Sequence, residues 1–163
     1  MRGVAHKSTI KPMRSAYRIL AHVIAGLVVV QAAAIAFAFF GLLNWVGDGH
    51  HNLTPTMVND QSADFTGSLG FEIHSWGANL IALGALVLLI MSFFAKVPGG
   101  VKWAAILFGI VVLQWALAFI AFGAPVVGLL HGANALAVIG IAELAASKAR
   151  GTQVSTPEAV AVA

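Results

Sequence analysis

The sequence predicts an all-α fold, a bundle of four transmembrane helices in an integral membrane protein. Of the 163 residues, 60% are hydrophobic and only 9% are charged, and the mean hydropathy is +0.91. A soluble domain carries about 25% charged residues, so this composition is typical of a chain in lipid. Four apolar stretches each reach the roughly 20 residues that a helix needs to cross about 30 Å of hydrocarbon. The sequence contains no cysteine, which excludes disulfides, iron–sulfur clusters, thiolate-bound haem and c-type haem attachment.

The expected elements follow one another along the chain with few long connections. Residues 1–16 form a basic N-terminal arm, the bundle covers 17–147, and 148–163 form a flexible tail. The four helices are expected at about Tyr17–Leu43, Phe71–Ala95, Lys102–Gly123 and Pro125–Ala146, with an outer loop over 44–70. The first stretch is too long for the apolar region of a signal peptide, so we expect it to be a retained helix. Glycine and proline near positions 98–100 and 123–125 indicate two tight turns.

The distribution of basic residues predicts the topology. All nine lie before or at the start of the first helix, around the turn between the second and third helices, or after the fourth: Arg2, Lys7, Lys11, Arg14, Arg18, Lys96, Lys102, Lys148 and Arg150. Basic residues are retained on the cytoplasmic side, so both termini are expected in the cytoplasm and the chain in the plasma (inner) membrane. The net charge of +3 is therefore a topology signal, and no nucleic-acid-binding motif accompanies it.

An internal repeat relates the two halves of the predicted bundle. Gly26–Gln31 in the first helix reads GLVVVQ, and Gly109–Gln114 in the third reads GIVVLQ. The second and fourth helices then each carry one histidine shortly after their outer ends. Similarity arises easily in apolar sequence, but the matched glutamines favour a duplication of two parallel helix hairpins.

Two histidines are the main candidates for a functional site. His74 lies about three residues into the second helix and His131 about six residues into the fourth, and both helices enter from the outer side. At 1.5 Å per residue, their depths differ by less than about one helical turn. An imidazole in a bilayer is costly unless it is bound, and two facing imidazoles can ligate one haem iron inside a helical bundle. We therefore expect one b-type haem, haem b, held by both histidines.

The residues beside these histidines are small or carry an amide. Gly77 and Ala78 share the face of the second-helix histidine, and Asn134 and Ala135 share the face of the fourth-helix histidine. Small side chains leave room for a flat macrocycle between the helices. Structural zinc is a weaker alternative because such a site takes four ligands.

Four amide side chains lie within the predicted spans. Gln31, Gln114, Asn79 and Asn134 are expected to join helices by hydrogen bonds. The alternative for Gln31 and Gln114 is contact with a haem edge or a bound quinone, and Asn134 could orient a ligand histidine. A bundle without cofactor, in which the histidines bond only to these amides, is the competing hypothesis.

One histidine in the second helix and one in the fourth, near the outer face of a four-helix unit, resembles one half of the heme A synthase family. The resemblance covers roughly residues 15–147 and implies a histidine-ligated haem. The sequence departs from the family at Glu72, which stands two residues before His74 rather than a full turn. Ser75 and Gly132 stand where the family often has arginine. No outer arginine is left to pair with haem propionates, and the loop cysteines of the family are absent, so haem A synthesis is not expected.

The remaining histidines and the inner carboxylate are weaker candidates. His22 is expected to be a partly hydrated side chain near the cytoplasmic face, and His50 and His51 to be solvated loop residues. Glu143 is expected to reach the inner interface or to pair with Lys148.

Three hypotheses for function follow from the sequence. The first is a b-type haem protein for electron transfer, or an accessory of a respiratory or haem-handling system with a redox or membrane-complex partner. The second is a cofactor-free structural or assembly subunit, and the third is a small transporter. No phosphate loop or nucleotide motif is present, so any enzymatic role would be that of a haem-dependent oxidoreductase. A homo-oligomer in the bilayer is compatible with all three.

Overall fold

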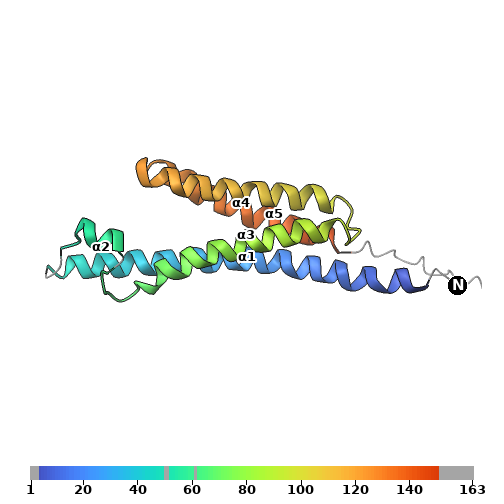
Figure 1. Cartoon of the computed structure of the whole chain (residues 1–163), viewed down its shortest axis with the longest axis horizontal. Coiled ribbons are helices and arrows are strands. Elements are labelled where there is room, and N and C mark those ends of the chain that lie inside the picture. The colour runs from blue at the N-terminus through green and yellow to red at the C-terminus, as the bar shows by residue number, and fades with distance from the viewer. Residues whose placement is uncertain (1–3, 50–51, 61, 151–163) are drawn as a thin grey trace, which may run out of the picture.

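The computed structural model describes residues 4–49, 52–60 and 62–150, and over these residues it contains five helices and no β-strand. The helices are α1 (Val4–Gly47), α2 (Pro55–Asp60), α3 (Leu69–Ser92), α4 (Gly100–Gly123) and α5 (Val127–Lys148) (Figure 1). Four stretches are long and apolar enough to cross a membrane, namely Pro12–Gly47 within α1 and the whole of α3, α4 and α5. The predicted all-α bundle is confirmed, and its composition is that of a multi-pass membrane protein.

Helix α1 is longer than the hydropathy of the sequence predicts. It begins at Val4, so most of the segment expected to be a separate basic arm continues the helix. Its 44 residues correspond to a length of about 66 Å, roughly twice the thickness of the hydrocarbon core. The short helix α2 in the outer loop was not predicted. Most of the expected tail, residues 151–163, lies outside the described residues.

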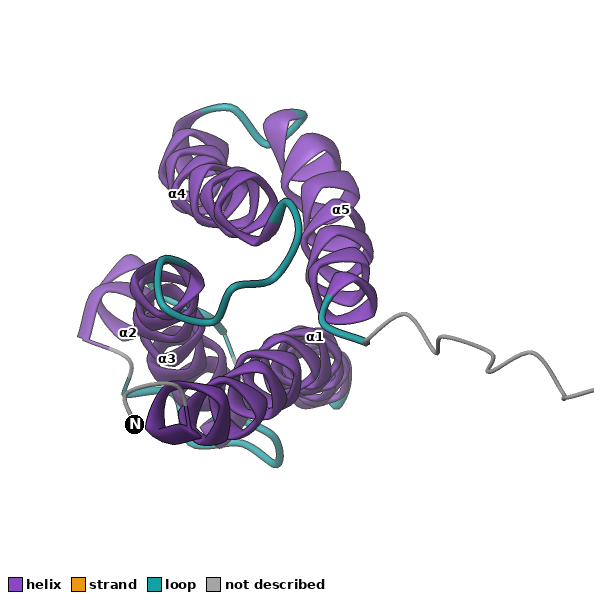
Figure 2. Cartoon of the chain, turned by 90° about the vertical axis from the view of Figure 1, so that its right-hand side faces the viewer, coloured by secondary structure: helices purple, strands orange, loops and turns teal. Residues whose placement is uncertain are grey.

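The four long helices form a bundle of two hairpins. Helix α1 packs on α3 in the first hairpin and α4 packs on α5 in the second, while α1 also meets α5 and α3 also meets α4. The order around the bundle is therefore α1, α3, α4, α5, so α3 and α5 lie diagonally opposite each other (Figure 2). This topology places the two helices that carry the candidate histidines on opposite sides of the bundle axis.

The tightly packed core lies in the half of the bundle that contains the α3–α4 turn. Its largest fully buried side chains are Tyr17, Ile24, Leu88, Leu107 and Val138, which come from all four long helices. The Tyr17 hydroxyl donates a hydrogen bond to the Gly100 carbonyl at 3.2 Å, which ties α1 to the start of α4. We call this half the inner half, because it lies beside Lys102 and Lys148.

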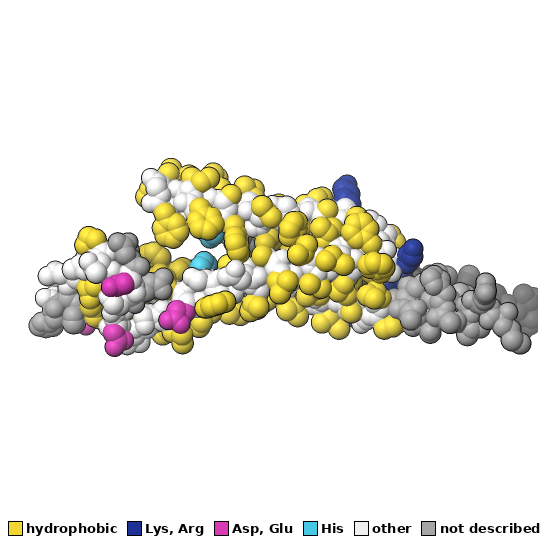
Figure 3. Space-filling model, viewed as in Figure 1, with side chains coloured by type: hydrophobic (Ala, Val, Ile, Leu, Met, Phe, Trp, Pro, Cys, Tyr) yellow, Lys and Arg dark blue, Asp and Glu magenta, His cyan; other side chains and the backbone are white. Residues whose placement is uncertain are grey.

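The two hairpins separate toward the outer end. No residue of α4 after Val111 is buried, and no residue of α5 before Val138 is buried. In Figure 1 the α4–α5 hairpin diverges from α1 and α3, and Figure 3 shows a hollow between the two hairpins. The bundle is therefore closed on the inner side and open on the outer side.

The first hairpin stays closely packed over its whole length because α3 carries glycine where it meets α1. A side chain at Gly70 would meet the backbone carbonyl of Ala34, and one at Gly77 would meet the carboxamide of Gln31. Small residues at such contacts let transmembrane helices approach closely. In the outer part of α5, by contrast, a Cβ atom added at Gly132 would have no neighbour within 4 Å, so the space around this residue is open.

Candidate functional site

The structure brings His74 of α3 and His131 of α5 together across the outer opening. Their ring centroids are 6.4 Å apart and the ring planes are inclined by 56°. Both side chains are half-buried, and Figure 3 shows histidine on both walls of the hollow. The backbones of α3 and α5 do not contact each other, so the two imidazoles approach each other from diagonally opposed helices.

The ring of His74 is oriented by the helix that it packs against. Its Nδ1 lies 3.1 Å from the backbone carbonyl oxygen of Gln31 on α1. A carbonyl oxygen can only accept a hydrogen bond, so Nδ1 must carry the proton. In the neutral ring, Nε2 then keeps a free lone pair that can bind a metal ion.

The side chain of Gln31 links α1 to the turn of α3 that carries this histidine. Its Nε2 donates a hydrogen bond to the Ile73 carbonyl at 3.0 Å, and the carboxamide occupies the space above Gly77. The side chain is only 6% exposed, and its Oε1 has no hydrogen-bond partner among the described residues. Gly77, which the sequence suggested as a wall of a cofactor site, therefore serves to admit the glutamine amide.

The second hairpin repeats this contact with its own glutamine and histidine. Nδ1 of His131 lies 3.1 Å from the backbone carbonyl oxygen of Gln114, and the Gln114 Nε2 donates to the His131 carbonyl at 3.0 Å. Here the amide oxygen is also satisfied, because Asn134 Nδ2 donates to Gln114 Oε1 at 2.6 Å and to the Ile110 carbonyl at 2.9 Å. The glutamines that match in the sequence repeat thus perform the same structural task in both hairpins.

The Gln114 amide nitrogen also lies 3.1 Å from each of the two ring nitrogens of His131. The bonding directions of the two ring nitrogens lie in the ring plane and diverge. The Gln114 amide nitrogen is equally close to both ring nitrogens, so it cannot lie along the bonding direction of either one. The amide therefore packs against the ring and does not bond to either nitrogen along its lone pair. It restricts rotation of the imidazole while its hydrogen bond to the backbone holds it in place.

The separation of the two rings has the length that two opposed imidazoles sharing a metal ion would have. A metal–imidazole bond of about 2.0 Å, plus roughly 1.15 Å from the nitrogen to the ring centroid, places two opposed imidazoles about 6.3 Å apart. The observed 6.4 Å agrees with this value. A bound histidine usually donates its other N–H to a carbonyl or carboxylate, and both histidines here donate to a glutamine backbone. Among the described residues no group of three or more His, Cys, Asp or Glu side chains gathers.

Several other candidate residues lie away from this pair. Glu143 was expected to reach the inner interface or to pair with Lys148, and the pairing with Lys148 is wrong. Its carboxylate lies 2.9 Å from Nδ1 of His22 on α1, and the two side chains are 46% and 40% exposed. Asn79 donates to the Ser75 carbonyl within α3 rather than to another helix, so the expected interhelical bond is wrong for this residue.

The remaining sequence candidates add little to the site. Asn134 makes the interhelical bonds that were predicted for it. Ala78 and Ala135 are half-buried on α3 and α5. His50 and His51 lie outside the described residues.

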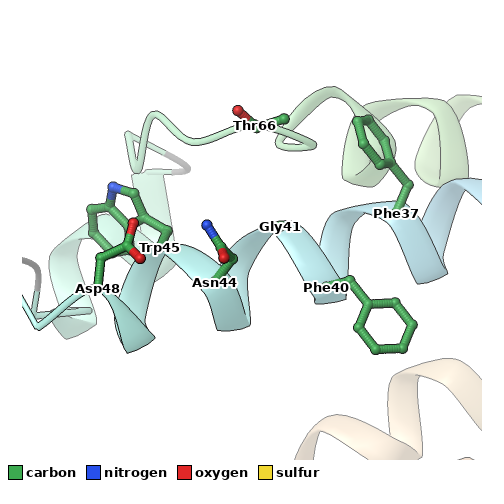
Figure 4. A pocket seen from close by; sticks show the side chains of 7 residues that line it. All are labelled: Phe37, Phe40, Gly41, Asn44, Trp45, Asp48 and Thr66. Carbon is green, nitrogen blue, oxygen red and sulfur yellow. The ribbon is translucent and has the colours of Figure 1, made fainter.

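Two cavities of the described structure lie away from His74 and His131. One of about 310 Å³ lies at the outer end of α1, between Asn44 and the segment around Thr66. Its lining side chains point in different directions, with Phe40 turned away from Thr66, so they do not converge on one ligand (Figure 4). The other, of about 180 Å³, is apolar and is lined by Ala82 of α3 and by residues of α4 that include Trp115.

No known protein family matches this chain, and no curated protein or solved structure is significantly similar to it.

Proposed function

We propose that this membrane protein binds one b-type haem between its two hairpins, with His74 and His131 as the axial ligands. The observation that carries the proposal is the 6.4 Å separation of the two imidazole centroids across an open, diagonal gap. The resemblance to one half of the heme A synthase family agrees with this site but is not needed for it.

The local hydrogen bonds support the same conclusion. Each histidine donates its Nδ1 hydrogen to a glutamine backbone, which selects the tautomer in which Nε2 can ligate iron. Two histidines packed only for stability would not need the same tautomer or a gap between them. No side chain is buried in the outer halves of α4 and α5. The gap between the two hairpins is therefore open there.

A haem bound here would supply reversible one-electron chemistry within the bilayer. The residues of the chain would hold the two imidazoles in register and surround them with apolar helices. This arrangement suits an electron-transfer protein, or a haem-bearing accessory of a respiratory or haem-handling system.

The test is spectroscopic. The protein is expressed in cells supplied with a haem precursor, purified in detergent, and its absorption is recorded in the oxidised and reduced states. We expect a low-spin Soret band that His74→Ala and His131→Ala each remove. His22→Ala, which changes a histidine of the inner half, is the matched control and should leave the spectrum unchanged. A colourless wild-type protein would refute the proposal.

A cofactor-free structural subunit is the second candidate. It is favoured by the fact that each histidine already has a hydrogen-bonding partner within its own hairpin. On this hypothesis the purified protein has no Soret band, and both histidine variants lose stability without any change in colour.

A further inference from the structure

We propose that the surface shared by α1 and α5 in the inner half binds a lipid-soluble hydroquinone, whose ring hydroxyl is held by His22 and Glu143. The two residues belong to different hairpins, and Nδ1 of His22 lies 2.9 Å from a carboxylate oxygen of Glu143. This surface is separate from the outer opening that holds His74 and His131. The inference therefore goes beyond the proposed function and does not depend on it.

The pair lies on the lipid-facing surface of the bundle, within two membrane-spanning stretches. Helices α1 and α5 pack side by side (Figure 2), and both residues fall inside the stretches that are long and apolar enough to cross a membrane. The side chains of His22 and Glu143 are nevertheless 40% and 46% exposed. Ionisable side chains within transmembrane helices are rare, usually face the protein interior, and mark functional sites. A pair that faces lipid instead is expected to meet a polar group from the membrane.

The depth of the pair shows what kind of molecule can reach it. His22 lies four residues after Arg18, and Glu143 lies five residues before Lys148. These separations correspond to about 6 Å and 7.5 Å along a helix axis. Basic side chains near helix ends extend to the membrane interface, so the pair lies just inside the inner interface. The partner is therefore an amphiphile, with its polar end at this interface and its apolar part in the hydrocarbon.

The hydrogen bond within the pair determines which polar group it recognises. An ionised carboxylate can only accept a hydrogen bond, so Nδ1 of His22 carries the hydrogen. In the neutral ring Nε2 then keeps a free lone pair, and no residue in the described part of the chain donates to it. The carboxylate also fixes the orientation of the ring. The complementary group is a hydroxyl that donates to Nε2.

Each of the two helices carries a glycine one turn deeper in the membrane than the pair. Gly26 follows His22 by four residues, and Gly140 precedes Glu143 by three residues on the antiparallel helix, so both glycines share the face of the pair. Both glycines are exposed, and a Cβ atom added at either would have no neighbour within 4 Å. Glycine allows a ligand to approach the backbone closely. A flat ring can therefore lie against the helices beside the pair.

Hydroquinones combine the properties that this surface requires. The ring is flat, its hydroxyl donates a hydrogen bond, and an alkyl tail keeps the molecule in the hydrocarbon. The dimethyl ether of a hydroquinone has the same ring and tail but no hydrogen to donate to Nε2. A fatty alcohol has the hydroxyl but no ring to lie against the glycines. These two analogues separate the two parts of the site.

The experiment is a binding titration of the full chain, purified in detergent without quinone and without haem. Decylubiquinol, its dimethyl ether and dodecanol are each added under argon, and binding is followed by calorimetry. We expect saturation at one decylubiquinol per chain. Its dimethyl ether should bind about tenfold more weakly, which is the effect of one hydrogen bond. Dodecanol should show no saturable binding over the same concentrations.

Substitutions on the surface locate the site. His22→Phe should make decylubiquinol and its dimethyl ether bind equally. Gly140→Leu should abolish saturable binding by covering the backbone, and the space around Gly140 is open, so the bundle can still fold. Gly109→Leu is the matched control, because Gly109 is also exposed within a transmembrane helix and has open space around it. It should leave the affinity unchanged.

The outcomes separate this inference from the proposed function. Equal affinity of the wild type for decylubiquinol and its dimethyl ether would overturn the role of the pair, and binding that survives Gly140→Leu would overturn the place of the ring. Saturable binding of dodecanol would overturn recognition of the ring. A protein that binds decylubiquinol but never shows a Soret band would refute haem binding alone. A protein with a Soret band that binds no decylubiquinol would refute only this inference.

Discussion

Replacement of Gly77 by alanine is the sharpest test of how the first hairpin holds its histidine. An alanine Cβ at this position would overlap the carboxamide of Gln31. The carboxamide would have to move, and it would lose its bond to the Ile73 carbonyl. Because Gln31 also supplies the backbone oxygen that orients His74, the same movement would disturb the imidazole.

The expected loss of stability can be worked out from these contacts. Overpacking of a well-packed interior costs about 1–3 kcal/mol, and leaving a buried amide without its partner costs about 1–3 kcal/mol. Alanine is favoured over glycine within a helix by roughly 0.5–1 kcal/mol, which offsets part of the loss. We therefore expect Gly77→Ala to lower the free energy of unfolding by about 1–5 kcal/mol.

The chain offers a matched control in Gly109, which is also within a transmembrane helix. A Cβ built at Gly109 has no neighbour within 4 Å, so Gly109→Ala should leave stability unchanged or raise it by up to about 1 kcal/mol. Unfolding would be followed by tryptophan fluorescence as detergent micelles are enriched in dodecyl sulfate. If Gly77→Ala proved as stable as Gly109→Ala, the contact between Gln31 and α3 would not be as described.

Two further predictions concern the rest of the bundle. A double-mutant cycle with His22→Phe and Glu143→Gln should give a coupling energy of about 0.6 kcal/mol, which is the average for hydrogen bonds between transmembrane helices. A coupling energy of zero would mean that the pair between His22 and Glu143 does not form in the membrane. Because the chain contains no cysteine, single thiols can report its orientation. Ser62→Cys should react with an impermeant maleimide added to intact cells, whereas Lys148→Cys should react only after permeabilisation, and the reverse pattern would invert the topology.

Hydropathy predicted the transmembrane elements well because crossing a bilayer demands long apolar helices. It did not predict the start of α1, since a helix that continues into water has no apolar signal, and here the first residues are basic. Helix α2, with six residues, is too short to have a recognisable pattern. The extents of α4 and α5 agree with the sequence to within about two residues, because glycine and proline mark both ends of α4 and the start of α5.

The candidate site was predicted in part. The shared depth of His74 and His131 could be worked out from helix rise, and in the structure their ring centroids lie 6.4 Å apart. The role of Gly77 could not be worked out from the sequence, because it depends on how α1 and α3 are rotated about their axes. Of the two alternatives for Glu143, the pairing with Lys148 was wrong for a similar reason, since only the order of helices around the bundle places His22 of α1 beside α5.

The central claim is that one haem lies between His74 and His131, and a haem titration tests it most directly. Protein purified without haem in detergent would be titrated with ferric haem while the Soret band is recorded. We expect saturation at one haem per chain, with the low-spin spectrum of iron bound by two imidazoles. A titration without saturation, or one that gives the same spectrum in the double variant His74→Ala and His131→Ala, would contradict it.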